Sequence, residues 1–152
     1  MKTDPKARYQ GYTFFFKEGF CWTLILNENS EYQKARLKGC TVNDVNTMTL
    51  YPFLDTKCYL KYFICLLNSY SIFYYKRNFI SSNSAFQIND ARELPIIIPN
   101  KKILNEFNIL FDQAVKIKKQ HFSSIVPNEK ADTRLISIQQ QLDKLVEKLY
   151  SI

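Results

Sequence analysis

The sequence predicts an α+β fold: a small mixed or antiparallel sheet with a buried helix, followed by two long amphipathic C-terminal helices. Runs of β-branched and aromatic residues alternate with turn residues over positions 12–53. From residue 58 onward, apolar residues recur at helical spacing instead. Two further stretches with that spacing follow, one from Asn100 to about residue 122 and one from about Thr133. The change of period from two to three or four residues places the strands before the helices.

The first half of the predicted sheet is formed by YTFFF (12–16) and FCWTLIL (20–26), which we expect to be strands. Gly19, in the KEG segment between them, suits a hairpin turn. A polar loop, 27–35, comes next. ARLKGC and VNDVNTMTLYPF then predict two more strands around turn residues Asn43, Asp44 and Asn46.

The segment CYLKYFICLLNSYSIFYY (58–75) predicts one mostly buried helix. Its spacing places seven residues on one face, namely Leu60, Phe63, Ile64, Leu67, Tyr70, Ser71 and Tyr74. Polar residues interrupt the segment, so it falls short of the about twenty apolar residues that a membrane span requires. We therefore expect no membrane association.

A polar stretch leads from this helix into NDARE, where Asn89 is expected to cap a single helical turn that Pro95 ends. PIII then predicts a short strand. Because Pro95 and Pro99 lack a backbone N–H, this strand belongs at the end or the edge of the sheet.

Asn100 is well placed to cap the first long helix, and SSIVPNEKAD forms the loop after it. The second helix carries apolar residues at steps of three and four, which predict a paired-helix seam: Leu135, Ile138, Leu142, Leu145 and Leu149. We expect residues 1–100 to form a recognition domain and 101–152 a helical element for docking or self-association.

Twenty-one Lys and Arg residues against fourteen Asp and Glu residues give a net charge of +7, which favours nucleic acid as the partner. The first twenty residues mix charges with aromatics, unlike a signal peptide, so we expect a cytoplasmic location. The cysteines are far apart, and we expect reduced core thiols at all four positions: Cys21, Cys40, Cys58 and Cys65.

Few residues suggest catalysis. The three glycines are isolated, so neither a dinucleotide fingerprint nor a glycine-rich methyl-donor site can be written, and we expect no cofactor. His121 is the only histidine, and no cysteines have zinc-site spacing. Asp44, Asp55 and Lys57 could serve metal-assisted phosphodiester cleavage, so a small nuclease is one alternative.

Four stretches occur in an order that resembles the TaqI-like C-terminal specificity domain, the target-recognition region of restriction-modification DNA adenine methyltransferases, which is related to type I specificity subunits. They are FKEGFCWT (16–23), LLNSYSIFYYK (66–76), FQINDARELPIIIPN (86–100) and QQQLDKLVEKLY (139–150). The resemblance extends over residues 10–152. It implies that the motif residues are scaffold, and that the Leu-Pro-Ile strand passes the chain to bracing helices.

The resemblance implies a DNA-binding specificity module without its own enzymatic activity, because no Asn-Pro-Pro loop for a flipped adenine occurs. Its expected partners are double-stranded DNA and a methyltransferase catalytic domain or subunit, with self-association through the C-terminal helices also possible. From position and residue type alone we predict DNA contacts at Lys34, Arg36, Lys38, Asn43, Asn46, Lys76 and Arg77. A helical assembly protein with an incidental basic face is the second alternative.

Overall fold

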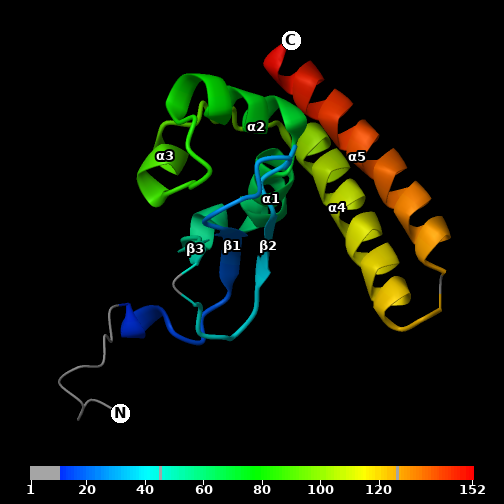
Figure 1. Ribbon diagram of the computed structural model, residues 1–152, viewed down its shortest axis with the longest axis horizontal. Helices are drawn as coiled ribbons and strands as arrows, with labels where there is room; N and C mark the ends of the chain where they lie inside the picture. The colour runs from blue at the N-terminus through cyan, green and yellow to red at the C-terminus, as the bar shows by residue number, and fades with distance from the viewer. Residues whose placement is uncertain (1–10, 45, 126) are drawn as a thin grey trace.

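A computed structural model of the chain describes residues 11–44, 46–125 and 127–152. The fold is α+β, as predicted (Figure 1). Its sheet has three antiparallel strands in the order β2-β1-β3, with bounds Gly19–Thr23 for β1, Ala35–Lys38 for β2 and Thr47–Leu50 for β3. At the centre, Cys21 of β1 lies opposite Arg36 of β2 and Thr49 of β3.

The predicted strand at 12–16 and the hairpin at Gly19 are wrong. Tyr12–Phe14 forms a 3-10 helix, η1, since both edges of β1 are already occupied by β2 and β3. Gly19 is instead the first residue of β1. A Cβ atom there would lie 2.4 Å from the carbonyl oxygen of Leu50, so the β1–β3 pairing requires glycine.

The buried segment after the sheet is two helices and not one. A 3-10 helix, η2 (Leu54–Tyr59), leads into α1 (Leu60–Leu67), which is followed by α2 (Tyr70–Tyr75) and a π-helical turn, η3 (Lys76–Ile80). The break falls at Asn68, whose side chain bonds the backbone of Ala35, and at Ser69, which accepts from the amide of Ile72. The single face predicted for 58–75 is therefore wrong, and Tyr70 and Tyr74 are exposed.

The short helix α3 (Ile88–Arg92) lies where a capped turn was predicted, but its N-cap is Gln87 and not Asn89. The amide of Gln87 donates to the Asp90 carboxylate at 2.7 Å. This bond sets the start of α3 two residues before the predicted cap.

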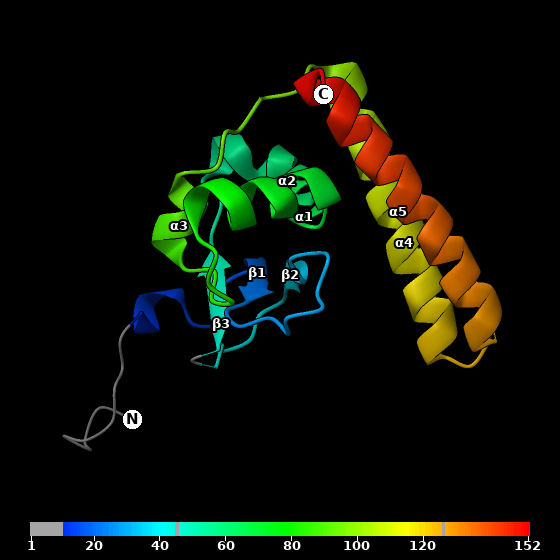
Figure 2. The ribbon, with the colours of Figure 1, turned by 45° about the horizontal axis from the view of Figure 1, so that its top comes forward.

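The predicted strand between Pro95 and Pro99 is wrong, because this extended segment pairs with no strand among the described residues. Two tyrosine hydroxyls donate hydrogen bonds to carbonyl groups of this segment. Tyr62 Oη donates to Ile97 O and Tyr150 Oη donates to Pro95 O, each at 2.5 Å. Figure 2 shows the segment crossing from α3 to the start of α4.

Two long helices form an antiparallel hairpin, α4 (Lys101–Phe122) and α5 (Asn128–Tyr150). The predicted Asn100 cap is confirmed, with its Oδ1 accepting from Ile103 N at 3.0 Å. The second helix begins five residues before the predicted Thr133, and its N-cap residue is Pro127. Within the described ranges no helix is long and apolar enough to cross a membrane.

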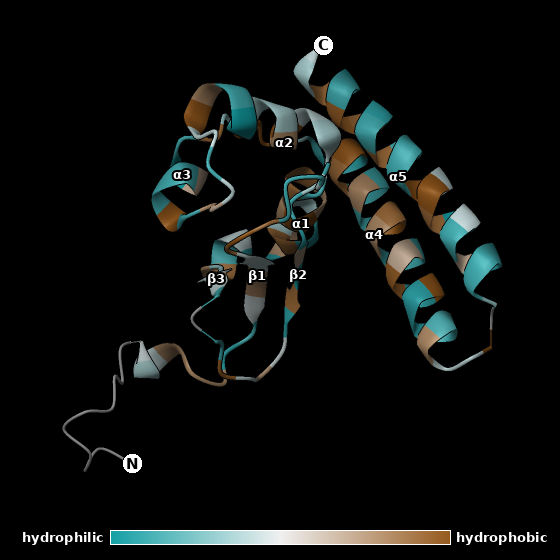
Figure 3. Ribbon diagram, in the orientation of Figure 1, coloured by the Kyte–Doolittle hydropathy of each residue, from teal (hydrophilic) through white to brown (hydrophobic). Residues whose placement is uncertain are grey.

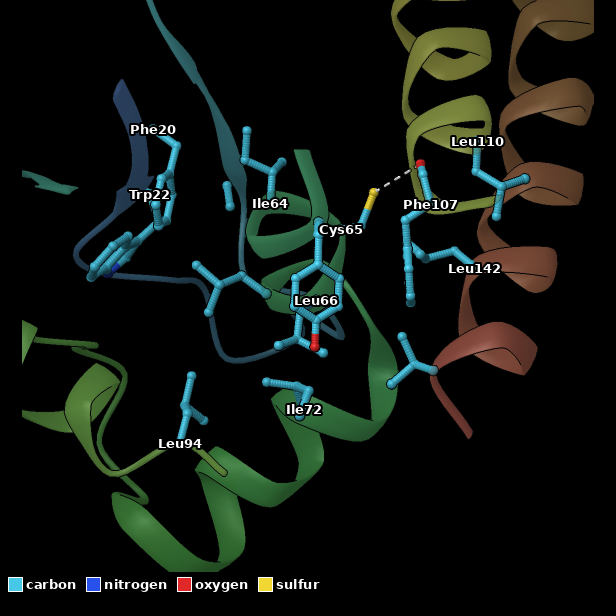
Figure 4. Packing of buried hydrophobic residues seen from close by; sticks show 14 of the residues in the cluster. Phe20, Trp22, Ile64, Cys65, Leu66, Ile72, Leu94, Phe107, Leu110 and Leu142 are labelled. Atoms are coloured by element: carbon cyan, nitrogen blue, oxygen red, sulfur yellow. Dashed lines mark hydrogen bonds between the residues drawn. The ribbon is translucent and has the colours of Figure 1, made fainter. Parts of the chain in front are cut away.

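The hydrophobic core joins the sheet, α1 and the helical hairpin (Figure 4). Trp22, Tyr62 and Phe107 are completely buried, and Tyr62 meets Phe107 edge to face with ring centroids 5.0 Å apart. All four cysteines are free, as expected, but only Cys21 and Cys65 are buried. The expectation of core thiols is therefore wrong for Cys40 and Cys58.

Candidate nucleic-acid interface

Several loops meet at the C-terminal end of β1, where the strand stops at Thr23. The amide of Leu24 donates to Asn46 O at 2.9 Å, and Gln33 Nε2 donates to Thr23 O at 2.8 Å. These bonds hold the residues before β2 and before β3 against the end of the central strand. Lys34 and Asn46, both exposed, therefore flank the same end of the sheet.

A third segment is fixed at this end by pairing that extends beyond β1. Leu26 N donates to Ser84 O at 3.2 Å and Phe86 N donates to Leu24 O at 2.8 Å. The indole of Trp22 donates to Phe86 O at 2.8 Å from inside the core. Residues 82–84 are thus held beside residues 26–28, although they are more than fifty positions apart in the chain.

The π-helical turn η3 contributes the cations of this region. Ser81 N donates to Lys76 O at 2.9 Å, a bond across five residues that defines the π geometry. Lys76 is buried, and its Nζ donates to Asn83 O at 2.6 Å, so this lysine fixes the 82–84 loop. Burial lowers the pKa of Lys76 below its ordinary value. Arg77 is exposed, and its Nη1 donates to Glu28 O at 3.4 Å.

These segments enclose a depression of about 390 Å³, which we call the polar pocket. Its exposed lining residues are Asn27, Glu28, Arg77, Ser82, Asn83 and Ser84. Amide, hydroxyl and carboxylate groups from two loops and the guanidinium group of η3 converge here. Together they offer both the donors and the acceptors that base edges require in the major groove of DNA.

The seven predicted contact residues fall into two groups. Lys34, Asn46 and Arg77 are exposed around the end of β1. Arg36 is also exposed but lines a different groove, which lies between β2 and the α4–α5 hairpin.

The other three residues are held in the fold. Lys38 is 4% exposed, and its Nζ donates to the carbonyl oxygens of Lys17, Gly39 and Thr41 at 2.6, 3.1 and 2.7 Å. Asn43 is half-buried and donates to Thr49 Oγ1. Lys76 is buried as described above. These three residues are excluded from the contact set because they are buried or half-buried and their polar groups bind the protein.

Sequence reasoning missed four members of the polar pocket: Asn27, Ser82, Asn83 and Ser84. The signal in the sequence was a pair of polar runs, NENSE (27–31) and SSNS (81–84), which are about fifty positions apart. These two runs lie side by side because residues 24–26 pair with residues 84–86, and no local sequence pattern predicts that pairing.

The residues proposed for a nuclease site lie far apart along β3. Asp44 precedes the strand and Asp55 follows it in η2, so the strand separates the two carboxylates. In the described part of the chain, no group of three His, Cys, Asp or Glu residues is placed to bind a metal ion. The geometry offers nothing to bring these acids to one ion.

The residues that carry the family resemblance have structural roles. Trp22 is buried, Asn68 and Ser69 end one helix and begin the next, and Leu94 is buried in the core. The loops that line the polar pocket lie outside these motifs. No protein-family model, curated protein or solved structure matches this chain.

Proposed function

We propose that this chain is a sequence-specific DNA target-recognition module of a restriction-modification or phage-defence methyltransferase. The observation that carries the proposal is the polar pocket, because two loops and the π-helical turn η3 bring side chains suited to base edges together there, and backbone bonds between residues 24–26 and 84–86, together with Lys76, hold the loops in place. Rigid support of this kind is what a recognition surface requires, since ordering loops on binding costs affinity.

In this proposal, Arg77 reads a guanine edge, and Asn27 and Asn83 present amides suited to adenine. Lys34 contacts phosphate at the margin and sets the register of the duplex. Lys76 positions the loop through Asn83 without touching DNA. A separate catalytic domain supplies the methyl donor site and meets the adenine of the bound sequence.

The test is a fluorescence-anisotropy titration of the chain against a randomised duplex at several salt concentrations, followed by selection and sequencing of the bound fraction. We expect salt-sensitive binding and an enriched, non-palindromic motif. Absence of binding at the lowest salt concentration would contradict autonomous recognition.

Two substitutions separate reading from positioning. Arg77→Ala should cost about 1–3 kcal/mol on the selected sequence and relax preference at one position. Lys34→Ala should weaken all sequences alike and reduce the salt slope by about 1. Arg92→Ala is the matched control, because Arg92 is exposed on α3 outside the polar pocket. Equal losses of affinity for the selected sequence in Arg77→Ala and Arg92→Ala would contradict base reading by Arg77.

A further inference from the structure

A second depression, of about 1050 Å³, separates β2 from the lower half of the helical hairpin; we call it the hairpin groove. Its floor is apolar and is formed by side chains such as Leu110, Ala114, Val115, Leu135 and Ile138. Figure 3 shows apolar segments, coloured brown, recurring along α4. On the hairpin, α1 packs against α4 and α2 packs against α5. Within the groove lining, Val115 and Leu135 are half-buried, and Phe122 and Ile136 are exposed.

The length of the hairpin groove suits a helix of about three turns. Its α4 lining extends from Leu110 to Phe122 and its α5 lining from Asp132 to Leu142. At 1.5 Å per residue, the α4 lining is about 18 Å long, which is three turns or more. Both linings follow antiparallel helices, so a third helix laid between them would complete a three-helix bundle.

The charge of the hairpin groove decides what occupies it. Arg36, Lys118 and Lys119 are exposed along its margins, and Asp132 is the one acidic residue in the lining. A second copy of this chain, which carries a net charge of +7, would bring like charge to a basic groove. DNA complements the cations but would leave the apolar floor unused. An amphipathic helix with acidic margins satisfies both the floor and the cations.

We propose that the hairpin groove binds an acidic amphipathic helix of the catalytic partner. The identity of the partner rests on the proposed function, whereas the chemistry of the helix rests on the groove alone. Its apolar face packs on Leu110, Val115 and Leu135, and its glutamates or aspartates meet Arg36, Lys118 and Lys119. The hairpin groove thereby joins the recognition module to its catalytic domain away from the polar pocket.

The probe is a displayed library of 18-residue helices with leucine at an i, i+3, i+4, i+7 spacing and Glu or Lys randomised at the flanking positions. Selection on the full chain should enrich Glu over Lys at those positions. A synthetic enriched peptide should bind at least tenfold more tightly than its Lys counterpart in fluorescence anisotropy.

Two sets of variants localise the binding. The triple change Arg36→Glu, Lys118→Glu and Lys119→Glu should invert the preference toward Lys peptides. The control triple Lys101→Glu, Lys102→Glu and Lys116→Glu, on α4 outside the hairpin groove, should leave the preference for Glu peptides unchanged.

The apolar floor is tested by a matched isoleucine pair on the exposed surface. Ile136, 59% exposed, lines the hairpin groove, and Ile109, 48% exposed, lies outside it. Ile136→Asp should weaken peptide binding at least tenfold, and Ile109→Asp should leave it unchanged. Circular dichroism of each variant checks that the helices remain folded.

Enrichment of Lys, or no enrichment, would overturn the proposal. A dimer in sedimentation equilibrium that Ile136→Asp dissociates would assign the hairpin groove to a second copy and overturn it as well. If the parent chain binds no peptide and the triple variant at Arg36, Lys118 and Lys119 loses DNA binding, the hairpin groove is a DNA-binding surface and the proposal is wrong. The DNA target-recognition proposal is tested separately: it fails if the selection on duplex DNA enriches no sequence.

Discussion

Two lysines only four positions apart in the chain have opposite environments. Lys34 is exposed beside the end of β1, whereas the ammonium group of Lys38 binds three backbone carbonyl oxygens at the other end of β2. Lys38 also lies over the ring of Tyr51, 5.5 Å from its centroid. The same residue type therefore supports the fold in one place and is available to a ligand in the other.

Replacing Lys38 by methionine removes the donor while keeping most of the side-chain volume. We expect Lys38→Met to lower the free energy of unfolding by about 2–3 kcal/mol, because the carbonyl groups of Lys17, Gly39 and Thr41 lose their charged partner. Urea unfolding followed by circular dichroism measures the loss. Lys34→Met is the matched control and should change stability by less than about 0.5 kcal/mol; similar losses in the two variants would contradict the assignment.

Cys65 gives a prediction about pH. Its thiol is buried and contacts Phe107 O at 3.8 Å (Figure 4), and burial raises its pKa from 9.0 to about 12. The unfolded chain therefore loses this proton near pH 9 while the folded chain keeps it. Stability from this residue is complete below pH 9 and falls as pH rises toward 12, by up to about 1.4 kcal/mol per pH unit.

Cys65→Ser removes this titration because a serine hydroxyl stays protonated in both states. Between pH 9 and pH 10 we expect the free energy of unfolding of the Ser variant to fall less steeply than that of the parent chain. Chemical unfolding at closely spaced pH values measures the difference. Cys65→Ala is a second variant without a thiol and should show the same reduced slope as Cys65→Ser.

At the scale of elements, Asn68 connects a helix to a strand. Its Oδ1 accepts from Ala35 N at 2.8 Å and its Nδ2 donates to Ala35 O at 2.9 Å, so one side chain satisfies both backbone groups of the first residue of β2. The same residue ends α1. The position of β2 and the break between α1 and α2 therefore depend on each other.

Asn68→Ala should speed solvent exchange at the backbone amide of Ala35 and lower the free energy of unfolding by about 1–2 kcal/mol, because Ala35 O loses the Asn68 donor and Ala35 N keeps only Gln33 O as acceptor. Hydrogen exchange measured by NMR detects the local effect at Ala35. Asn105→Ala, at an exposed position of α4, should leave exchange at Ala35 unchanged. Unchanged protection of Ala35 in the Asn68 variant would contradict the anchor.

The elements that local spacing determines were predictable, and those that depend on distant contacts were not. α4 follows from the Asn100 cap and a continuous apolar stripe. The break at Asn68 depends on Ala35, 33 positions away, and the segment 95–99 stays out of the sheet because Tyr62 and Tyr150 occupy its carbonyls. In the candidate site, Arg77 was foreseen from its charge, but its loop partners at 27 and 82–84 were not.

At the scale of the whole molecule, the two predicted domains share side chains in one core. Phe107 of α4 is completely buried against Tyr62 of α1, and Val146 of α5 belongs to the same cluster. We therefore expect residues 11–152 to unfold in a single transition, with the helical hairpin and the sheet losing structure together.

Phe107→Ala tests this coupling because it removes a ring between the two parts. We expect a loss of about 3–5 kcal/mol, observed equally by tryptophan fluorescence of Trp22 and by the helical signal in circular dichroism. Ile109→Ala, on the exposed side of the same helix, should cost far less. Separate transitions for the two probes would instead indicate independent units.

The π-helical turn makes the position of the following loop depend on the number of residues in η3. One residue more than an α-helical turn is accommodated between Lys76 and Ser81, and the loop that follows carries Ser82 and Asn83 into the polar pocket. Deleting a single residue here would restore α-helical bonding and rotate everything after it by about 100° around the helix axis. A one-residue deletion would therefore change which side chains line the polar pocket, so this surface is altered by changes in chain length as well as by substitution.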